Sequence, residues 1–239
     1  MIGRRILRGA AVAVAVLLPV GLVAASPATA APAKPKTATV SVLHGIPGLT
    51  VDVYANDALL IDDFTPGSLK TVKVPGGTYN LEIFPATSTD SSGTPVLQAS
   101  ATVANGKNYT VTANLSATGT PALNVFVNNM APIVKGAKKG RVTVRHIAAA
   151  PAVDVFVNGN VAFSGLTNPN QVQTVLPRGV YQTAAGLAGA GTAGIALGPV
   201  PLPVKAGFNA IVYAWGVPQS AGGAGVQVAV QYVKLAMPK

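Results

Sequence analysis

The chain has 239 residues, no cysteine, and 17 basic against 7 acidic side chains, which gives a formal net charge of +10. The lack of cysteine excludes disulfides and a lipid-modified cysteine, and in an exported protein it favours a bacterial source over a eukaryotic one. Frequent Gly and Pro, few charges, and Val and Thr in short alternating runs indicate β structure and exclude a long helical bundle.

The N-terminus has the pattern of a signal peptide. Basic residues at positions 4, 5 and 8 precede an apolar run from Ala10 to Ala25, and Ala-Thr-Ala at 28–30 is a small-x-small motif. We expect cleavage before Ala31, by either the Sec or the twin-arginine route. A retained anchor is the weaker alternative, because the 16-residue run contains Pro19 and a membrane helix needs about 20 residues.

Removing residues 1–30 leaves a mature chain of 209 residues with a net charge of +7. This mature chain contains no further candidate membrane segment. We expect a protein of a Gram-positive bacterium, released from the cell or held to its wall by non-covalent contacts.

The two halves of the mature chain resemble each other in sequence. A shift of 102 residues lays Val40–Tyr79 over Val142–Tyr181 without a gap, and 11 of the 40 pairs are identical. The pattern returns at a shift of 101, where Val103–Val111 matches Val204–Val212. The two histidines of the chain, His44 and His146, fall on one repeat position, so the sequence predicts two copies of one fold unit.

Each copy is expected to contain about eight short strands in about 100 residues, which is typical of an immunoglobulin-like or transthyretin-like β-sandwich. In the first copy the expected strands are 39–44, 50–55, 59–61, 69–74, 78–84, 96–103, 109–115 and 122–128. In the second copy they are 142–146, 153–157, 161–163, 172–176, 180–184, 200–204, 210–215 and 226–233. The fold class is therefore all-β, with two tandem sandwiches after a cleaved signal peptide.

The side-chain period of two places Val51 and Val53 inside the first sandwich, with Asp52 and Tyr54 pointing the other way. Hairpin turns are expected at Asn56-Asp57 and at Asn158-Gly159.

In both copies a Pro-x-Gly-x-Tyr segment places a tyrosine, Tyr79 or Tyr181, at the start of a strand. This resembles the tyrosine corner of sandwich folds, whose hydroxyl bonds back to the preceding loop.

The expected domain boundaries follow from composition. They are a signal peptide at 1–30, a disordered Pro/Ala/Lys tail at 31–38, a first sandwich at 39–131, a basic linker at 132–140 and a second sandwich at 141–239. The Gly/Ala run from Ala184 to Gly198 is expected to be a mobile loop.

His44 with Asp52, and His146 with Asp154, are the paired polar residues kept in both copies. A His and a carboxylate could bind a metal or exchange protons, but one of each is too few for zinc, and no nucleophile motif accompanies them. The alternative is structural, with the His ending the first strand and contacting the next strand or turn. We favour the structural role and expect no catalytic site.

Three further motifs could indicate a ligand site, but each also has a simpler explanation. Gly189–Gly194 spells G-x-G-x-x-G, but no βαβ unit surrounds it, so we expect a loop and no bound cofactor. Calcium at Asp62-Asp63 is conceivable, although the Asp-x-Asp-x-Asp-Gly loop is missing. Ile211, Tyr213 and Trp215 on one strand face could form a sugar platform, or more commonly a packed core.

Charge divides unevenly between the copies. Residues 31–131 hold five Lys and six acids, whereas residues 132–239 hold nine basic residues and one acid. The basic half predicts attraction to an anionic cell-wall polymer or envelope surface, or it serves solubility alone. Nucleic acid is not expected, because the basic residues lack interleaved aromatics.

The order Val-x-Val-x-His, Val-Asp-Val-Tyr/Phe with a following Asn, and Pro-x-Gly-x-Tyr resembles domain-of-unknown-function family 4397, found in exported bacterial proteins. From this resemblance we expect an actinobacterial source. The resemblance covers Thr39–Val233 as two units. It implies a secreted or surface-associated sandwich with no assigned activity, and it transfers no catalytic residue.

The expected function is therefore a non-catalytic binding or structural protein of the envelope, whose ligand and oligomeric state stay open. The alternative is a small-ligand or metal-binding protein that uses the repeated His/Asp pairs.

Overall fold

The computed structural model describes residues 36–88 and 90–237, and nearly all of its regular structure is β-strand. Residues 35–239 form one compact unit. The expected signal peptide and most of the expected tail lie outside the described residues. No helix of the described part is long and apolar enough to cross a membrane.

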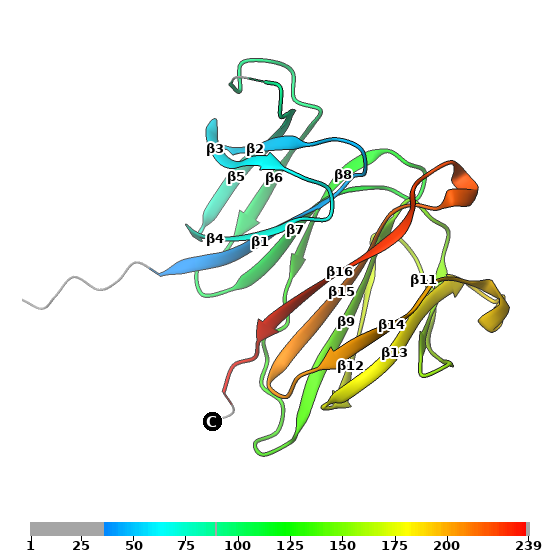
Figure 1. Ribbon diagram of the computed structural model, residues 1–239. Coiled ribbons are helices and arrows are strands. Elements are labelled where there is room, and N and C mark those ends of the chain that lie inside the picture. Colours follow the sequence, from blue (N-terminus) through cyan, green and yellow to red (C-terminus); the bar gives the residue numbers. More distant parts are fainter. Residues whose placement is uncertain (1–35, 89, 238–239) are drawn as a thin grey trace, which may run out of the picture. The chain divides into compact units, whose positions relative to one another are not determined.

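In the described residues sixteen strands fold into two sandwiches, which confirms the predicted all-β fold of two tandem sandwiches (Figure 1). The first sandwich contains β1 Thr37–Gly45, β2 Val51–Ala55, β3 Ala58–Phe64, β4 Leu69–Pro75, β5 Gly77–Pro85, β6 Leu97–Val103, β7 Asn108–Leu115 and β8 Pro121–Val127. The second contains β9 Lys139–Ala148, β10 Val153–Val157, β11 Asn160–Leu166, β12 Gln171–Pro177, β13 Gly179–Leu187, β14 Ile195–Val204, β15 Phe208–Val217 and β16 Gly225–Lys234.

The two sandwiches share one topology. The sheet orders are β4-β1-β7-β8 and β3-β2-β5-β6 in the first, and β12-β9-β15-β16 and β11-β10-β13-β14 in the second. All neighbouring strands are antiparallel except β1 with β7 and β9 with β15, which are parallel. Each strand of the second sandwich therefore has its counterpart eight strands earlier in the chain.

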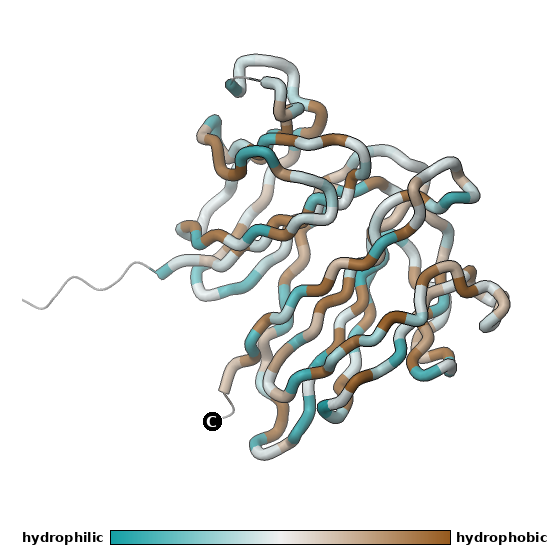
Figure 2. The backbone as a smooth tube through the Cα atoms, in the orientation of Figure 1, coloured by the Kyte–Doolittle hydropathy of each residue, from teal (hydrophilic) through white to brown (hydrophobic). Residues whose placement is uncertain are grey.

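The alternating strand pattern builds the cores, and along the strands hydrophobic positions alternate with paler, more polar ones (Figure 2). Val51 and Val53 join the core cluster of the first sandwich, together with Val40 and Val111. The opposite face of β2 is buried as well, because the Tyr54 ring packs edge-on against Phe84 with ring centroids 5.4 Å apart.

The hairpin after β2 turns at Asn56 and Asp57, whose φ angles of 50° and 65° are those of the turn type that matches strand twist. Asn158, with a φ angle of 49°, repeats this after β10. The Asn56 Oδ1 also accepts the backbone N–H of Asn80 at 2.8 Å, so the turn is bonded to the neighbouring strand.

The Gly/Ala run is more ordered than expected. Most of it pairs as β13 and β14, with Ala185 opposite Leu197 and Gly186 opposite Ile195, and the short 3-10 helix η1 (Gly191–Gly194) closes the connection. The expectation of a mobile loop from Ala184 to Gly198 was wrong, because residues without bulky side chains allow two strands to approach closely. At Gly186 an added Cβ would lie only 2.5 Å from the Gly194 carbonyl oxygen.

The outer faces of sheets β4-β1-β7-β8 and β12-β9-β15-β16 bury a shared cluster. Leu43 of β1 packs there with residues of the second sandwich, namely Ile147, Ile211, Tyr213, Trp215 and Val233. Tyr213 and Trp215 are 0% and 4% exposed, so they are packed side chains and not an open sugar platform.

A buried arginine crosses the same contact. Arg145 of β9 is 0% exposed, and its guanidinium donates to Tyr213 Oη at 2.9 Å, Asn128 Oδ1 at 2.8 Å and Gln171 Oε1 at 2.9 Å. It also lies 4.3 Å from the centroid of the Phe126 ring. The guanidinium thus donates to three neutral acceptors and lies over an aromatic ring, and the two sandwiches are hydrogen-bonded as well as packed.

Candidate functional site

Three connections meet at one end of the second sandwich and bring basic residues together. The segment before β9 lies beside the β12–β13 turn, because the Arg178 N–H donates to the Lys138 carbonyl at 2.7 Å. The β14–β15 turn closes on β9, since the Gly207 N–H donates to the Lys139 carbonyl at 3.0 Å. Gly140 permits this approach, because a Cβ there would collide with the Lys205 carbonyl.

We call this region the basic end. Its members are exposed cations that come from the segment before β9, from the first residue of β9, from the two turns and from the last residue of β16. They are Lys135, Lys138, Lys139, Arg178, Lys205 and Lys234.

No acid of the second sandwich opposes these charges. Its single acidic residue, Asp154, is buried near the start of β10, where its two carboxylate oxygens accept the N–H groups of Gly165 and Gly189. A cluster of exposed cations on turns creates a positive potential that attracts polyanions and weakens with salt.

Two other arginines of this half have structural roles. Arg141 donates to the carbonyls of Asn129 and Ala131, which ties the inter-sandwich segment to β9, and burial lowers its pKa. Arg145 is enclosed by the contact described above. Counting basic residues along the sequence therefore overstates the charge that a partner could reach.

The two histidines occupy equivalent places. His44 Nε2 donates to the Leu49 carbonyl at 2.7 Å, and His146 Nε2 donates to the Pro151 carbonyl at 2.9 Å. In each case Nδ1 accepts the N–H of the residue two positions on, at 3.4 Å. Burial lowers the pKa of both imidazoles, so they are neutral, and each closes the connection that follows the first strand of its sandwich.

The repeated aspartates serve a different contact. Asp52 Oδ1 accepts the Asp63 N–H at 2.9 Å, as Asp154 Oδ1 accepts the Gly165 N–H at 2.9 Å. The first bond joins β2 to β3, and the second joins β10 to β11. Among the described residues, no hydrogen bond joins a histidine to the aspartate of its pair.

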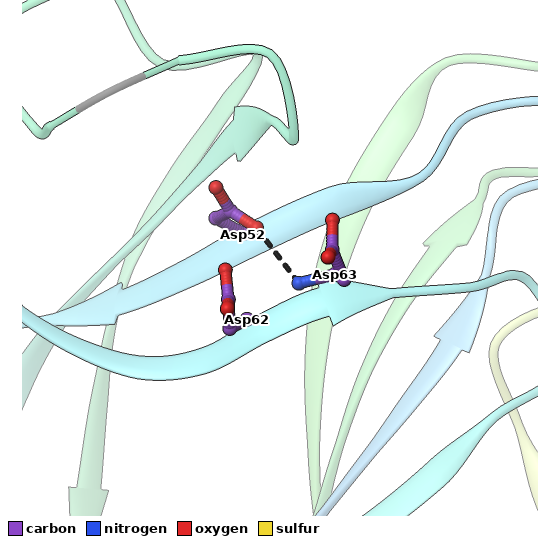
Figure 3. Close-up of side chains that lie close together, drawn as sticks. All are labelled: Asp52, Asp62 and Asp63. Atoms are coloured by element: carbon purple, nitrogen blue, oxygen red, sulfur yellow. Dashed lines mark hydrogen bonds between the residues drawn. The ribbon is translucent and has the colours of Figure 1, made fainter.

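A group of three carboxylates lies on β2 and β3 (Figure 3). One oxygen each of Asp52, Asp62 and Asp63 lies within 4.8 Å of the others, with Asp52 buried and the other two exposed. In the second sandwich Ser164 and Gly165 replace the two exposed acids. Close carboxylates at a surface repel one another, and solvent screens that repulsion without an ion.

Both tyrosines of the Pro-x-Gly-x-Tyr segments bond back to their turn. The Tyr79 hydroxyl donates to the Pro75 carbonyl at 2.8 Å, and the Tyr181 hydroxyl donates to the Pro177 carbonyl at 3.0 Å. The G-x-G-x-x-G run forms η1 and its approach between two antiparallel strands.

A family model described as "Domain of unknown function (DUF4397)" matches residues 38–156, which span the first sandwich and the first strands of the second. No curated protein matches the chain. The match starts one residue into β1 and includes the first copy of every motif that suggested the family, and the chain belongs to the DUF4397 family.

Proposed function

We propose that the protein is a non-catalytic binding protein of the bacterial envelope, exported from the cell, and that its basic end holds an anionic cell-wall polymer. The observation that carries the proposal is the gathering of six exposed cations on three adjoining connections of the second sandwich and on the adjacent ends of β9 and β16. A repeating anionic chain can contact several such cations at once, and each contact gains from the others.

The non-catalytic part of the proposal is supported by the engagement of the paired residues. Both nitrogens of His44 and of His146 are hydrogen-bonded to backbone groups, and Asp154 has both oxygens bonded to N–H groups. Side chains held in this way stabilise connections and are not free to exchange protons with a substrate.

The test is co-sedimentation of the mature protein with purified Gram-positive cell walls over a salt series. A variant with Lys138→Gln and Lys139→Gln is compared with a control that carries Lys70→Gln and Lys73→Gln on β4, which removes the same charge elsewhere. Each exposed ion pair contributes about 0.5–1 kcal/mol, so the basic-end variant should bind about 5- to 30-fold more weakly, and the control should bind like the parent.

Two outcomes would overturn the proposal. One is equal binding by both double variants at low salt. The other is absence of binding to walls together with binding to anionic phospholipid vesicles, which would assign the basic end to a lipid surface.

A further inference from the structure

The second sandwich contains a pocket at the end opposite the basic end. The pocket has a volume of about 310 Å³ and lies among the end of β9, the end of β13, the start of β14 and the β15–β16 hairpin. Its lining includes Ala148, Ala185, Gly186 and Val226. β15 alone spans 10 residues, or roughly 33 Å, so the two ends are separate surfaces.

The repeat shows which side chains leave room for this pocket in the second copy. At the shift of 102 residues, Ala185 corresponds to Ile83, which is 2% exposed and belongs to the core cluster of the first sandwich. Gly186 corresponds to Phe84, whose ring packs against Tyr54 on the opposite face of that sheet. Ala148 likewise corresponds to Ile46, which packs against the core. The second copy thus lacks two large core side chains where the first copy has them, and it also lacks the aromatic ring on the opposite face of β5.

One wall of the pocket is formed by a close backbone contact. Gly186 and Gly194 approach so closely that a Cβ on either would collide with its surroundings, and both residues line the pocket. η1 therefore covers the place that the ring of Phe84 takes in the first sandwich. Packed interiors hold few voids of this size, so the loss of core volume in the second copy needs an occupant or costs stability.

The lining is almost wholly apolar, and no charged side chain contributes to it. Its polar side chains are His146 and Ser220. His146 has both ring nitrogens bonded to backbone groups, whereas Ser220 is exposed on the β15–β16 hairpin. A fitting molecule is accordingly apolar over most of its length and uncharged, with room for a hydroxyl at the exposed Ser220 side.

The volume of the pocket also limits the size of the ligand. A dry apolar cavity of about 150 Å³ holds one benzene molecule, so a volume twice as large accommodates a chain of about 8 to 12 carbons. A whole membrane lipid, with two longer chains, exceeds it.

We propose that this pocket binds a free, single-chain aliphatic molecule of medium length with a neutral polar end, such as a medium-chain alcohol. The site is distinct from the basic end and does not depend on the polymer proposed there.

The experiment measures thermal unfolding of the mature protein with increasing 1-decanol, with 1-butanol as a short-chain comparison and phosphatidylcholine vesicles as a lipid comparison. Decanol should raise the Tm in a saturable way, because a ligand that binds only the folded state stabilises it, and butanol and vesicles should not.

Two filling variants, Ala148→Ile and Ala185→Ile, restore the residue of the first copy and should abolish the decanol shift. Ala162→Ile, an exposed position of β11, adds the same side chain outside the pocket and should keep the shift. Backbone amide chemical shifts of the parent give a second readout that needs no variant, with changes expected at 146–153, 185–187 and 194–197.

The proposal is overturned if decanol leaves the parent unchanged, if the filling variants respond like the parent, or if amide changes fall elsewhere. Stabilisation by vesicles alone would also overturn it, because the ligand would then be a membrane.

Discussion

Replacing Arg145 by Ala tests whether the buried guanidinium joins the two sandwiches. The substitution removes three hydrogen bonds of 2.8–2.9 Å. It leaves Gln171 Oε1 without its donor, and Asn128 Oδ1 keeps only the longer bond from the Thr110 hydroxyl, at 3.3 Å. Hydrogen bonds from a charged group contribute about 1.5–3 kcal/mol each, and part of this is offset because a buried charge no longer has to be desolvated. The net loss in the free energy of unfolding should be about 3–5 kcal/mol.

Urea denaturation followed by the fluorescence of the single tryptophan measures this loss, because Trp215 is 4% exposed and belongs to the same cluster. Arg145→Leu introduces the residue found at the equivalent position, Leu43, and should cost less than Arg145→Ala since it fills the space. Arg178→Ala, at an exposed turn, should change stability by less than about 0.5 kcal/mol. An Arg145→Ala protein within 0.5 kcal/mol of the parent would refute the reasoning.

Three further predictions concern the repeated residues and the acid group. Tyr79→Phe removes the hydroxyl bond to the Pro75 carbonyl and should lower the free energy of unfolding by about 1 kcal/mol, measured by urea titration. Stability should fall as pH drops below about 6.5, because burial lowers the pKa of His44 and His146 in the folded state and the unfolded chain then binds more protons. With both histidines contributing, the slope can reach about 2.7 kcal/mol per pH unit until the folded imidazoles protonate, as denaturation at pH 7.5, 6.0 and 5.0 would measure. Asp62→Asn should raise the Tm slightly at low ionic strength in EDTA, because it relieves repulsion among the three carboxylates.

Each of these has its own control. Tyr54→Phe keeps the ring that packs on Phe84 and should be close to neutral, so equal losses in both tyrosine variants would count against a bond-specific effect. The pH slope should shrink in a protein with His44→Gln and His146→Gln, and an unchanged slope would assign it to the carboxylates. A loss of Tm in Asp62→Asn that appears only with added calcium would show that the acid group holds an ion.

The strand pattern of this chain could be predicted from sequence because its signals are local. Val51 and Val53 alternate with polar or aromatic neighbours, and Asn56-Asp57 marks the turn, so strand and hairpin follow from side-chain period and turn chemistry. The shift of 102 residues then carried the same assignment to the second copy, including the Asn158 turn.

The contact between the sandwiches could not be predicted in the same way. Arg145 alternates with Val144 on β9, and such a pattern ordinarily indicates a solvent-facing arginine. The sequence signal for this contact lies on the neighbouring strand, β15. There Ile211, Tyr213 and Trp215 share one outward face that is too apolar to be exposed to water. What buries that face depends on tertiary packing, which the sequence of a single strand does not reveal.

The pocket, in contrast, was recoverable from the repeat. Comparing the copies for side-chain volume as well as identity sets Ala185 against Ile83 and Ala148 against Ile46. A loss of this size at core positions predicts either a cavity or a chain that folds in to fill it. The sequence does not decide between these, because the path of η1 depends on the close approach of Gly186 and Gly194.

The central claim is that the two ends of the second sandwich are different binding surfaces, one for a polyanion. The most direct measurement is a titration of the isotope-labelled mature protein with long-chain inorganic polyphosphate, followed through backbone amide chemical shifts at low salt. The chemical-shift changes should be confined to residues 134–139, 177–179, 205–208 and 234–236, and they should disappear in high salt. Changes spread evenly over both sandwiches, or centred on the pocket residues, would contradict it.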